Sequence, residues 1–289
     1  MTRLFDRFVQ DMQLRNFSES TIRSYTYALK QLATHFNKSP ELINEQEIKD
    51  YFLYNRNVKH WSRAAFSISI SAIKFFFEKT LQRKWHVFGL VRPPRDKSLP
   101  VILNLKEVNK IFSCIKMEHH KACLKTIYSL GLRIQEGTRL KVADIDSERM
   151  FVHIHKGKGA KDRYIPLPNA TVDLLRKFWK THRNPLLLFP APGRGGKQMP
   201  TTDKPIPVSS IQIAFKEACQ KANIHKNVSV HHLRHSYAVH LLEAGVDFRY
   251  VQQYLGHEDP KTTLIYTRLI NIALPDPIEA INKVMDAIR

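Results

Sequence analysis

Residues 230–268 gather side chains whose types and spacing could do chemistry. His231 and Arg234 stand three residues apart, so a helix would place them on one face. His257 follows a predicted helix end, and Tyr266 stands nine residues further on. This stretch has no carboxylate cluster that could hold a metal ion. Its phenol, guanidinium and two imidazoles suit phosphoryl transfer to a tyrosine, with arginine and histidine in place of metal ions as charge stabilisers.

The charge of the chain indicates a polyanionic partner. The 289 residues carry a formal net charge of +20, and the isoelectric point is about 9.9. Residues 1–95 hold a balance of +8 and the remainder a balance of +12, so both halves are expected to contact the same polyanion. Nucleic acid is the commonest such partner, and a generic basic surface is the alternative. A protein that closes around double-stranded DNA would have this distribution.

Cysteine usage and hydropathy indicate the compartment. Cys114, Cys123 and Cys219 are an odd number without metal-like pairing, which is typical of buried thiols in a reducing compartment. No apolar run reaches the ~20 residues of a membrane span. The first residues carry charges where a signal peptide needs an apolar core. We therefore expect a cytoplasmic protein that does not enter a membrane.

Residues 1–85 predict a small helical bundle, held together by aromatic stripes that are typical of a core. Four helices are expected, at 2–15, at 19–36 with Ser18 or Ser20 as cap, after Asn44, and at 62–81. Residues 86–100 change character, because their prolines and basic residues favour an extended linker without a helix. That linker is either merely solvated or lies along a phosphate backbone.

A second region begins at Asn104, which forms a capping-box pattern with Glu107. Its pattern predicts helices around one β-hairpin, in which Pro166 marks an edge strand. Residues 184–207 are rich in Pro, Gly and Lys and are expected to form a long loop that folds only on binding. The expected elements are helices at 105–116, 119–130 and 169–182, strands from 151 and 163, a helix capped by Ser209, and a helix ended by Gly245.

A set of motifs is spaced along the second region: Arg133 in Gly-Leu-Arg-Ile-Gln-Glu, Lys158 in Gly-Lys-Gly-Ala-Lys-Asp-Arg, His231-His-Leu-Arg234-His, Leu-Gly-His257, and Tyr266. Taken in order, these motifs resemble the tyrosine recombinase (phage integrase) family, which includes the Xer recombinases, lambda integrase and Cre. Each motif alone is weak, but six positions in this order over more than 130 residues form a specific signal.

The resemblance covers nearly the whole chain and includes the N-terminal bundle. Ser18, Thr21 and Tyr25 match the helix start of the family's core-binding domain. Two departures are visible, His232 where many members have Asp and Gly137 where an apolar residue is usual. Neither replaces a catalytic group, so both bear on local packing.

The resemblance implies a mainly α fold with a small antiparallel β-sheet, arranged as a two-domain DNA clamp. Residues 1–88 would be the helical core-binding domain, 89–100 a basic linker, and 101–289 the tyrosine-recombinase catalytic domain. The implied activity is site-specific cutting and rejoining of DNA strands through a 3′-phosphotyrosyl intermediate. The bond energy stays in that intermediate, so no metal, ATP or other cofactor is expected.

The resemblance also implies a role for each site residue. Tyr266 would attack the scissile phosphate, while Arg133 and Arg234 would hold its non-bridging oxygens. Glu136 would hold Arg133 in place. Lys158 would protonate the leaving 5′ oxygen, and Lys156 and Lys161 are the rival candidates for this role. His231 would bond the phosphate and could accept the tyrosine proton. His257 would donate to a phosphate oxygen.

Other residues of the same types have simpler explanations. Three further tyrosines, Tyr237, Tyr250 and Tyr254, occupy apolar helical spacings and are expected to pack in the core. His231 and His235 are spaced like a helical zinc pair, but the intervening Glu of a metalloprotease is missing. We expect His235 and His240 to pack or to bond backbone groups.

The resemblance implies a homotetramer that acts on two duplexes, with accessory DNA-bending proteins as further partners. A short amphipathic helix with Ile278, Ile281, Val284 and Met285 could dock on a neighbouring protomer or on its own domain. Two alternatives remain open. One is a type IB topoisomerase, and the other is a DNA-binding regulator that keeps the fold without catalysis.

Overall fold

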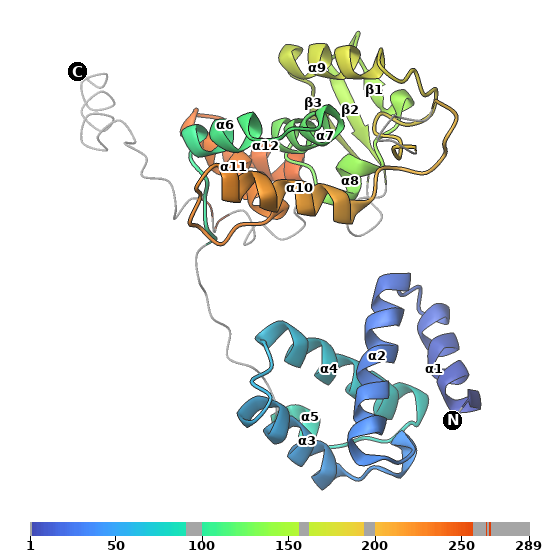
Figure 1. Cartoon of the computed structure of the whole chain (residues 1–289). Helices are drawn as coiled ribbons and strands as arrows, with labels where there is room; N and C mark the ends of the chain where they lie inside the picture. The colour runs from blue at the N-terminus through green and yellow to red at the C-terminus, as the bar shows by residue number, and fades with distance from the viewer. Residues whose placement is uncertain are drawn as a thin grey trace, which may run out of the picture. The chain divides into compact units, whose positions relative to one another are not determined.

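The computed structural model of the chain describes residues 2–90, 100–155, 162–193, 200–256, 264 and 266. The chain divides into two compact units, Met1–Lys97 and Ser98–Arg289 (Figure 1). Each unit has a buried apolar core of its own. Among the described residues, no helix combines the length and apolar character needed to cross a bilayer.

The first unit is a helical bundle with an aromatic core. Its elements are α1 (Thr2–Leu14), α2 (Glu19–Phe36), the short 3-10 helix η1 (Pro40–Leu42), α3 (Glu45–Asn57), α4 (Arg63–Phe75), the π-helical turn η2 (Phe76–Thr80) and α5 (Val87–Leu90). Helix α2 packs along α4, and the rings of Phe8 and Phe76 meet edge to face with their centroids 5.5 Å apart. The predicted caps are confirmed, because the Ser18 hydroxyl accepts the Thr21 backbone N–H and Asn44 forms a capping box with Glu47.

The end of the bundle differs from the extended stretch predicted for residues 86–100. Val87–Leu90 form helix α5, and the side chains of Val87 and Phe88 are buried in the core of the first unit. The backbone N–H of Val87 donates to Glu45 Oε1 at 2.6 Å, which fixes the start of α5 against α3. Apolar burial at these two positions outweighs the extended preference of the prolines that follow. Residues 91–99, the rest of the predicted linker, lie outside the described residues.

In the second unit a small sheet lies to one side of a group of helices (Figure 1). Its elements are α6 (Leu105–Ser113), α7 (Glu118–Ser129), α8 (Ile134–Thr138), η3 (Val142–Asp144), β1 (Ile145–Asp146), β2 (Phe151–Ile154), β3 (Arg163–Pro166), α9 (Asn169–Trp179), α10 (Val208–Lys221), α11 (Val230–Glu243) and α12 (Phe248–Leu255). The three strands are antiparallel in the order β1-β2-β3, so Pro166 lies on an edge strand as predicted. The mainly α fold with a small antiparallel sheet is confirmed.

Helix α7 lies at the centre of the second unit and packs against α9, α10 and α11. The predicted capping box at Asn104 and Glu107 is present. Ser209, however, is not a cap, because α10 begins at Val208 after Pro207, whose ring preorganises the backbone. The segment predicted to fold only on binding is also packed where it is described. Leu187 pairs with Lys141, and Leu188 and Phe189 are buried.

Candidate active site

Helix α11 carries Arg234 and, close to it in the sequence, His231, His232 and His235. Its start is fixed by His232, whose Nδ1 accepts the backbone N–H of Ser229 at 2.9 Å. An Asp carboxylate at this position would accept the same bond, so the His232 imidazole nitrogen takes the place of a carboxylate oxygen in capping the helix. This departure from the usual family pattern therefore changes only local bonding, as expected.

Glu136 binds two guanidinium groups at once. Its carboxylate accepts from Arg133 Nη1 at 2.8 Å, and from Arg163 Nη1 at 3.0 Å and Nη2 at 2.7 Å. It also accepts the backbone N–H of Arg133 at 2.8 Å, which holds the start of α8 in place. Arg163 begins β3, so Glu136 ties the sheet to the loop that carries Arg133. Glu136 thus holds Arg133, and it reaches Arg163, which the sequence did not single out.

The pKa of Glu136 reflects this pairing. Burial alone would raise the pKa of the carboxyl, but the hydrogen bonds and charges of Arg163 and Arg133 lower it to about 2. The carboxylate is therefore ionised over the whole physiological pH range. A buried carboxylate without these partners would be strongly destabilising.

Arg234 is buried beneath this cluster, with 1% of its surface exposed. Its Nη1 donates to the Gly131 carbonyl at 2.7 Å, and its Nη2 donates to the Leu255 carbonyl. Nη1 also lies 4.0 Å from Glu136 Oε2. Burial and the charge of Arg133 lower the pKa of Arg234 to about 9, while Glu136 raises it, so the guanidinium stays charged at neutral pH. The bonds that it donates to two carbonyls fix the orientation of this cation.

Two glycines make room for these contacts. Gly131 has a φ of 58°, and a Cβ there would lie 2.5 Å from a ring carbon of Tyr237. Gly137 stands where the family usually has an apolar residue, and a Cβ there would lie 2.4 Å from Ile127. The second departure from the family pattern is therefore a packing adjustment to Ile127, as expected.

Tyr266 lies within hydrogen-bonding distance of His235. Its hydroxyl is 2.6 Å from His235 Nδ1, and 2% of its surface is exposed. Burial raises the pKa of the phenol, while the charges of Arg234 and Arg133 lower it. The prediction that His235 packs or bonds backbone groups is wrong, because its partner is the Tyr266 side chain. The spacing of the two residues in the sequence gives no sign that Tyr266 lies against α11.

The imidazole of His235 is neutral in this setting. Burial, followed by the charges of His231, His232 and Arg234, lowers its pKa to about 4. The ring of His231 lies 4.5 Å from that of His235, but the His231 side chain is exposed. Partial loss of hydration and the charge of Arg234 lower the pKa of His231 as well. Of these two histidines, His235 is the one that the structure shows within hydrogen-bonding distance of the phenol.

The structure brings five of the predicted residues into one cluster, and two lie outside the description. Arg133, Glu136, His231, Arg234 and Tyr266 are linked by the contacts and charges above. Lys158, with its rivals Lys156 and Lys161, and His257 lie outside the described residues.

Two of the three other tyrosines pack in a core as expected, and the third is exposed. Tyr237 packs against the core around α11 and α12, where burial raises its pKa to about 12, and Tyr254 packs against the core around α7. Tyr250 is 56% exposed and stacks on Tyr254, so its expected core position is wrong. His240 has the backbone partner that was expected, a hydrogen bond with Leu103, and its Nδ1 also lies 2.8 Å from the Tyr128 hydroxyl.

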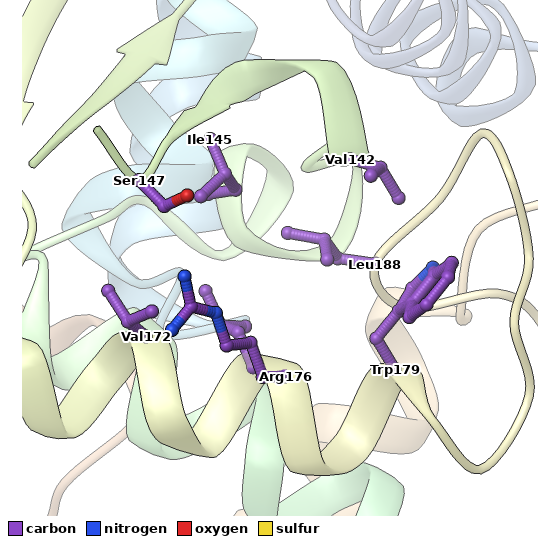
Figure 2. Close-up of a pocket in the computed structure, with 8 residues that line it drawn as sticks. Val142, Ile145, Ser147, Val172, Arg176, Trp179 and Leu188 are labelled. Carbon is purple, nitrogen blue, oxygen red and sulfur yellow. The ribbon is translucent and has the colours of Figure 1, made fainter. Parts of the chain in front are cut away.

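A separate cavity of about 220 Å³ lies between α9 and the β1 region (Figure 2). Its walls are mainly apolar, with Trp179 and Leu188 at one end and Arg176 reaching across it. None of the clustered arginine, histidine and tyrosine residues lines it. This cavity therefore does not belong to the candidate active site.

Two family descriptions match the chain. The Phage integrase family matches residues 102–271, and the phage integrase N-terminal SAM-like domain matches residues 4–87. The chain belongs to the phage integrase, or tyrosine recombinase, family. It is a site-specific recombinase that cuts and rejoins DNA, as the sequence predicts.

Two relatives agree with this membership, and a solved structure shares the fold. A candidate integrase/recombinase of Sinorhizobium fredii, y4qK, is 40% identical over 93% of this chain and 85% of its own length. The tyrosine recombinase XerA of Pyrococcus horikoshii is 33% identical over 96% of this chain and 92% of its own. A lambda integrase tetramer bound to a Holliday junction shares the fold, with a TM-score of 0.73 and 16% identity over 91% of this chain and 76% of that one.

Replacing Glu136 by Gln should destabilise the recombinase in a pH-dependent way. The folded-state pKa of about 2 lies below the ordinary value of 4.5, so the carboxylate stabilises the fold fully above about pH 4.5 and loses this effect as the pH falls toward 2. We expect the free energy of unfolding at pH 7 to drop by about 3 kcal/mol. The gap between the variant and the unmutated protein should narrow below about pH 4.5.

Urea denaturation at pH values from 7 to 3 measures this gap. Glu148→Gln is the matched control, because Glu148 is exposed and should leave stability unchanged at every pH. A gap that stays constant down to pH 3 would contradict the account of Glu136 as an ionised, paired carboxylate.

Proposed function

We propose that this recombinase cleaves DNA by attack of the Tyr266 hydroxyl on the scissile phosphate. Arg133 and Arg234 stabilise the charge that develops on the non-bridging oxygens. The attack breaks the bond to the 5′ oxygen and leaves a 3′-phosphotyrosyl link. A second strand's 5′ hydroxyl reverses the step and rejoins the DNA. The observation that carries this proposal is the buried Tyr266 hydroxyl, hydrogen-bonded to His235 and subject to the charges of both arginines.

The charge balance of the cluster suits a phosphate. Three guanidinium groups, those of Arg133, Arg163 and Arg234, surround the single carboxylate of Glu136. A diester phosphate would bring one negative charge to this excess of positive charge without a metal ion. Arg133, whose side chain is 25% exposed, can meet the phosphate first, with Arg234 beneath it. Tyr266 must become accessible as DNA binds, because it is covered in this conformation.

The proton of the attacking hydroxyl passes to His235 in this proposal. His235 Nδ1 is the acceptor at 2.6 Å, and its low pKa keeps the ring unprotonated at neutral pH. His231, the acceptor predicted from sequence, is exposed beside Arg133 and binds the phosphate instead. His257 donates a further bond to a phosphate oxygen.

Lys158 supplies the proton to the leaving 5′ oxygen. The glycine-flanked lysine belongs to residues 156–161, which follow β2 and precede β3 in the chain. Arg163 at the start of β3 bonds both Glu136 and the Tyr254 carbonyl. The root of the hairpin is therefore anchored to the arginine cluster, which supports delivery of Lys158 to the same phosphate.

Duplex DNA is held by both units in this proposal, as a clamp. We propose domains of residues 1–88 and 101–289 joined by residues 89–100, of which Gly89 and Leu90 complete helix α5. On the first unit, a hollow lined by Lys30, Lys59, Tyr27 and Trp61 offers the positive charge and aromatic surface that suit a DNA contact. Recombination proceeds in a homotetramer on two duplexes, by likeness to the lambda integrase tetramer, with accessory DNA-bending proteins, in the cytoplasm.

Tyr266→Phe should bind DNA with near-normal affinity and form no covalent adduct, because only the attacking oxygen is removed. Adduct on a suicide substrate is measured on a denaturing gel. Tyr237→Phe and Tyr250→Phe are the matched controls and should keep the adduct. The unmutated protein should form it in excess chelator as well. A persistent adduct in Tyr266→Phe would move the nucleophile to another residue.

His235→Ala should slow adduct formation by roughly 10²- to 10⁴-fold, the usual contribution of a general base. Single-turnover rates at saturating DNA are compared between pH 6 and pH 8. The unmutated protein should vary little, because His235 is unprotonated throughout this range. The variant should accelerate with pH, because hydroxide then takes the proton. If His231→Ala shows this slope and His235→Ala does not, the acceptor is His231.

Lys158→Ala should separate the acid from the phosphate clamp. The variant is expected to cleave an ordinary substrate very poorly, yet to cleave a 5′-bridging phosphorothiolate nearly as well as the unmutated protein, because a thiolate leaves without a proton. Arg234→Ala should fail on both substrates, since its role is to stabilise the non-bridging oxygens.

The matched controls for this test are Lys156→Ala and Lys161→Ala, assayed by the same gel. Sulfur rescue confined to either of them would assign the acid to that lysine instead of Lys158.

A further inference from the structure

Three side chains with metal-binding atoms meet at the base of the β2–β3 hairpin. His153 and His155 alternate along β2 and its extension, and Asp162 directly precedes β3. Asp162 Oδ2 lies 3.1 Å from His153 Nε2 and 3.6 Å from His155 Nδ1. One ligand atom from each of the three residues lies within 4.8 Å of the other two. The fold thus directs two imidazole nitrogens and a carboxylate oxygen toward one point.

A fourth side chain fixes the orientation of His155. Its Nε2, the nitrogen directed away from Asp162, lies 3.1 Å from Oδ1 of the buried Asp144. The other oxygen of Asp144 accepts the backbone N–H of Lys141 at 2.8 Å, so this carboxylate is itself held in place. Histidines that bind metals through one nitrogen usually donate the other N–H to such a group. This bond leaves His155 Nδ1 as the nitrogen available to a metal.

The ring of His153 is held as well. It stacks on Tyr164, its cross-strand neighbour, with centroids 4.5 Å apart and an angle of 10° between the planes. The pairing of β2 with β3 therefore positions His153, while Asp144 positions His155. Preorganised ligands of this kind lower the entropy cost of capturing an ion.

We propose that His153, His155 and Asp162 bind one divalent transition-metal ion of the zinc class. Two nitrogen donors and one carboxylate suit Zn²⁺ or Co²⁺, whereas Mg²⁺ and Ca²⁺ prefer oxygen donors alone. The side chain of His155 is 52% exposed and that of Asp162 is 49% exposed, so an ion can enter and water can complete its coordination. The alternative is a set of His–Asp pairs that binds no ion.

The ion would lie apart from the proposed phosphate chemistry. None of its ligands belongs to the cluster of Arg133, Glu136, Arg234 and Tyr266. His155 and Asp162 directly flank residues 156–161 in the sequence, so the ion would cross-link the two ends of that segment. The inference therefore concerns control of the hairpin and stands independently of the role proposed for Lys158.

Co²⁺ titration of the full-length protein tests the site, because tetrahedral Co²⁺ with nitrogen donors absorbs visible light. We expect the unmutated protein to bind one more equivalent than either His153→Ala or Asp162→Asn. His225→Ala is the matched control, since His225 is exposed, lies in the same unit and should not change the titration. Zn²⁺ should displace the bound Co²⁺, and Mg²⁺ at the same concentration should not.

Asp144→Asn gives a second measurement that does not remove a ligand. An amide can still accept the Lys141 N–H, but it binds the His155 ring more weakly, so Co²⁺ affinity should fall by roughly 10- to 100-fold. Thermal unfolding without metal checks that each variant is folded. Equal titrations for the unmutated protein and the His153 and Asp162 variants would overturn the proposal, and so would displacement of Co²⁺ by Mg²⁺.

Discussion

The carboxylate of Glu136 is the group on which the arrangement of the candidate active site depends. It binds Arg133 and Arg163 directly and lies 4.0 Å from the nearest nitrogen of Arg234. Without it, three guanidinium groups would repel one another in a partly dehydrated space. With it, the cluster keeps a surplus of two positive charges, which the single negative charge of a phosphodiester would lower to one. The same carboxylate therefore holds the arginines together without cancelling their positive charge.

The backbone around Arg234 is shaped to receive this cation. Gly131 and Gly256 both adopt positive φ, and the carbonyls of Gly131 and Leu255 accept the Arg234 bonds. A Cβ at Gly256 would lie 2.9 Å from Arg163 Cδ, so this position also favours a residue without a side chain. The guanidinium is thus oriented before substrate arrives, which is how electrostatic stabilisation avoids reorganisation during a reaction.

The sequence predicted those features that local chemistry determines. Caps at Asn44 and Asn104 follow from one side chain and one backbone amide three residues away, so short-range patterns suffice. The role of His235 could not be predicted in this way, because its bond to Tyr266 joins residues 31 positions apart. The predictions for residues 87–90 and for Tyr250 are wrong for a related reason. Whether these side chains are buried depends on which distant helix covers them, and a local pattern does not contain that information.

Strand β3 connects the two sites on opposite faces of the same hairpin. Asp162, a ligand of the proposed ion, immediately precedes Arg163, which binds Glu136. Successive side chains of a strand point to opposite faces, so a change in the position of Asp162 is transmitted through one peptide unit to Arg163. An ion that draws Asp162 toward His155 would therefore act on Arg163, which binds Glu136 in the arginine cluster. The proposed metal-independent cleavage and the proposed ion are compatible in one chain, because the ion would alter the support of the arginine cluster and would not contact the reacting phosphate.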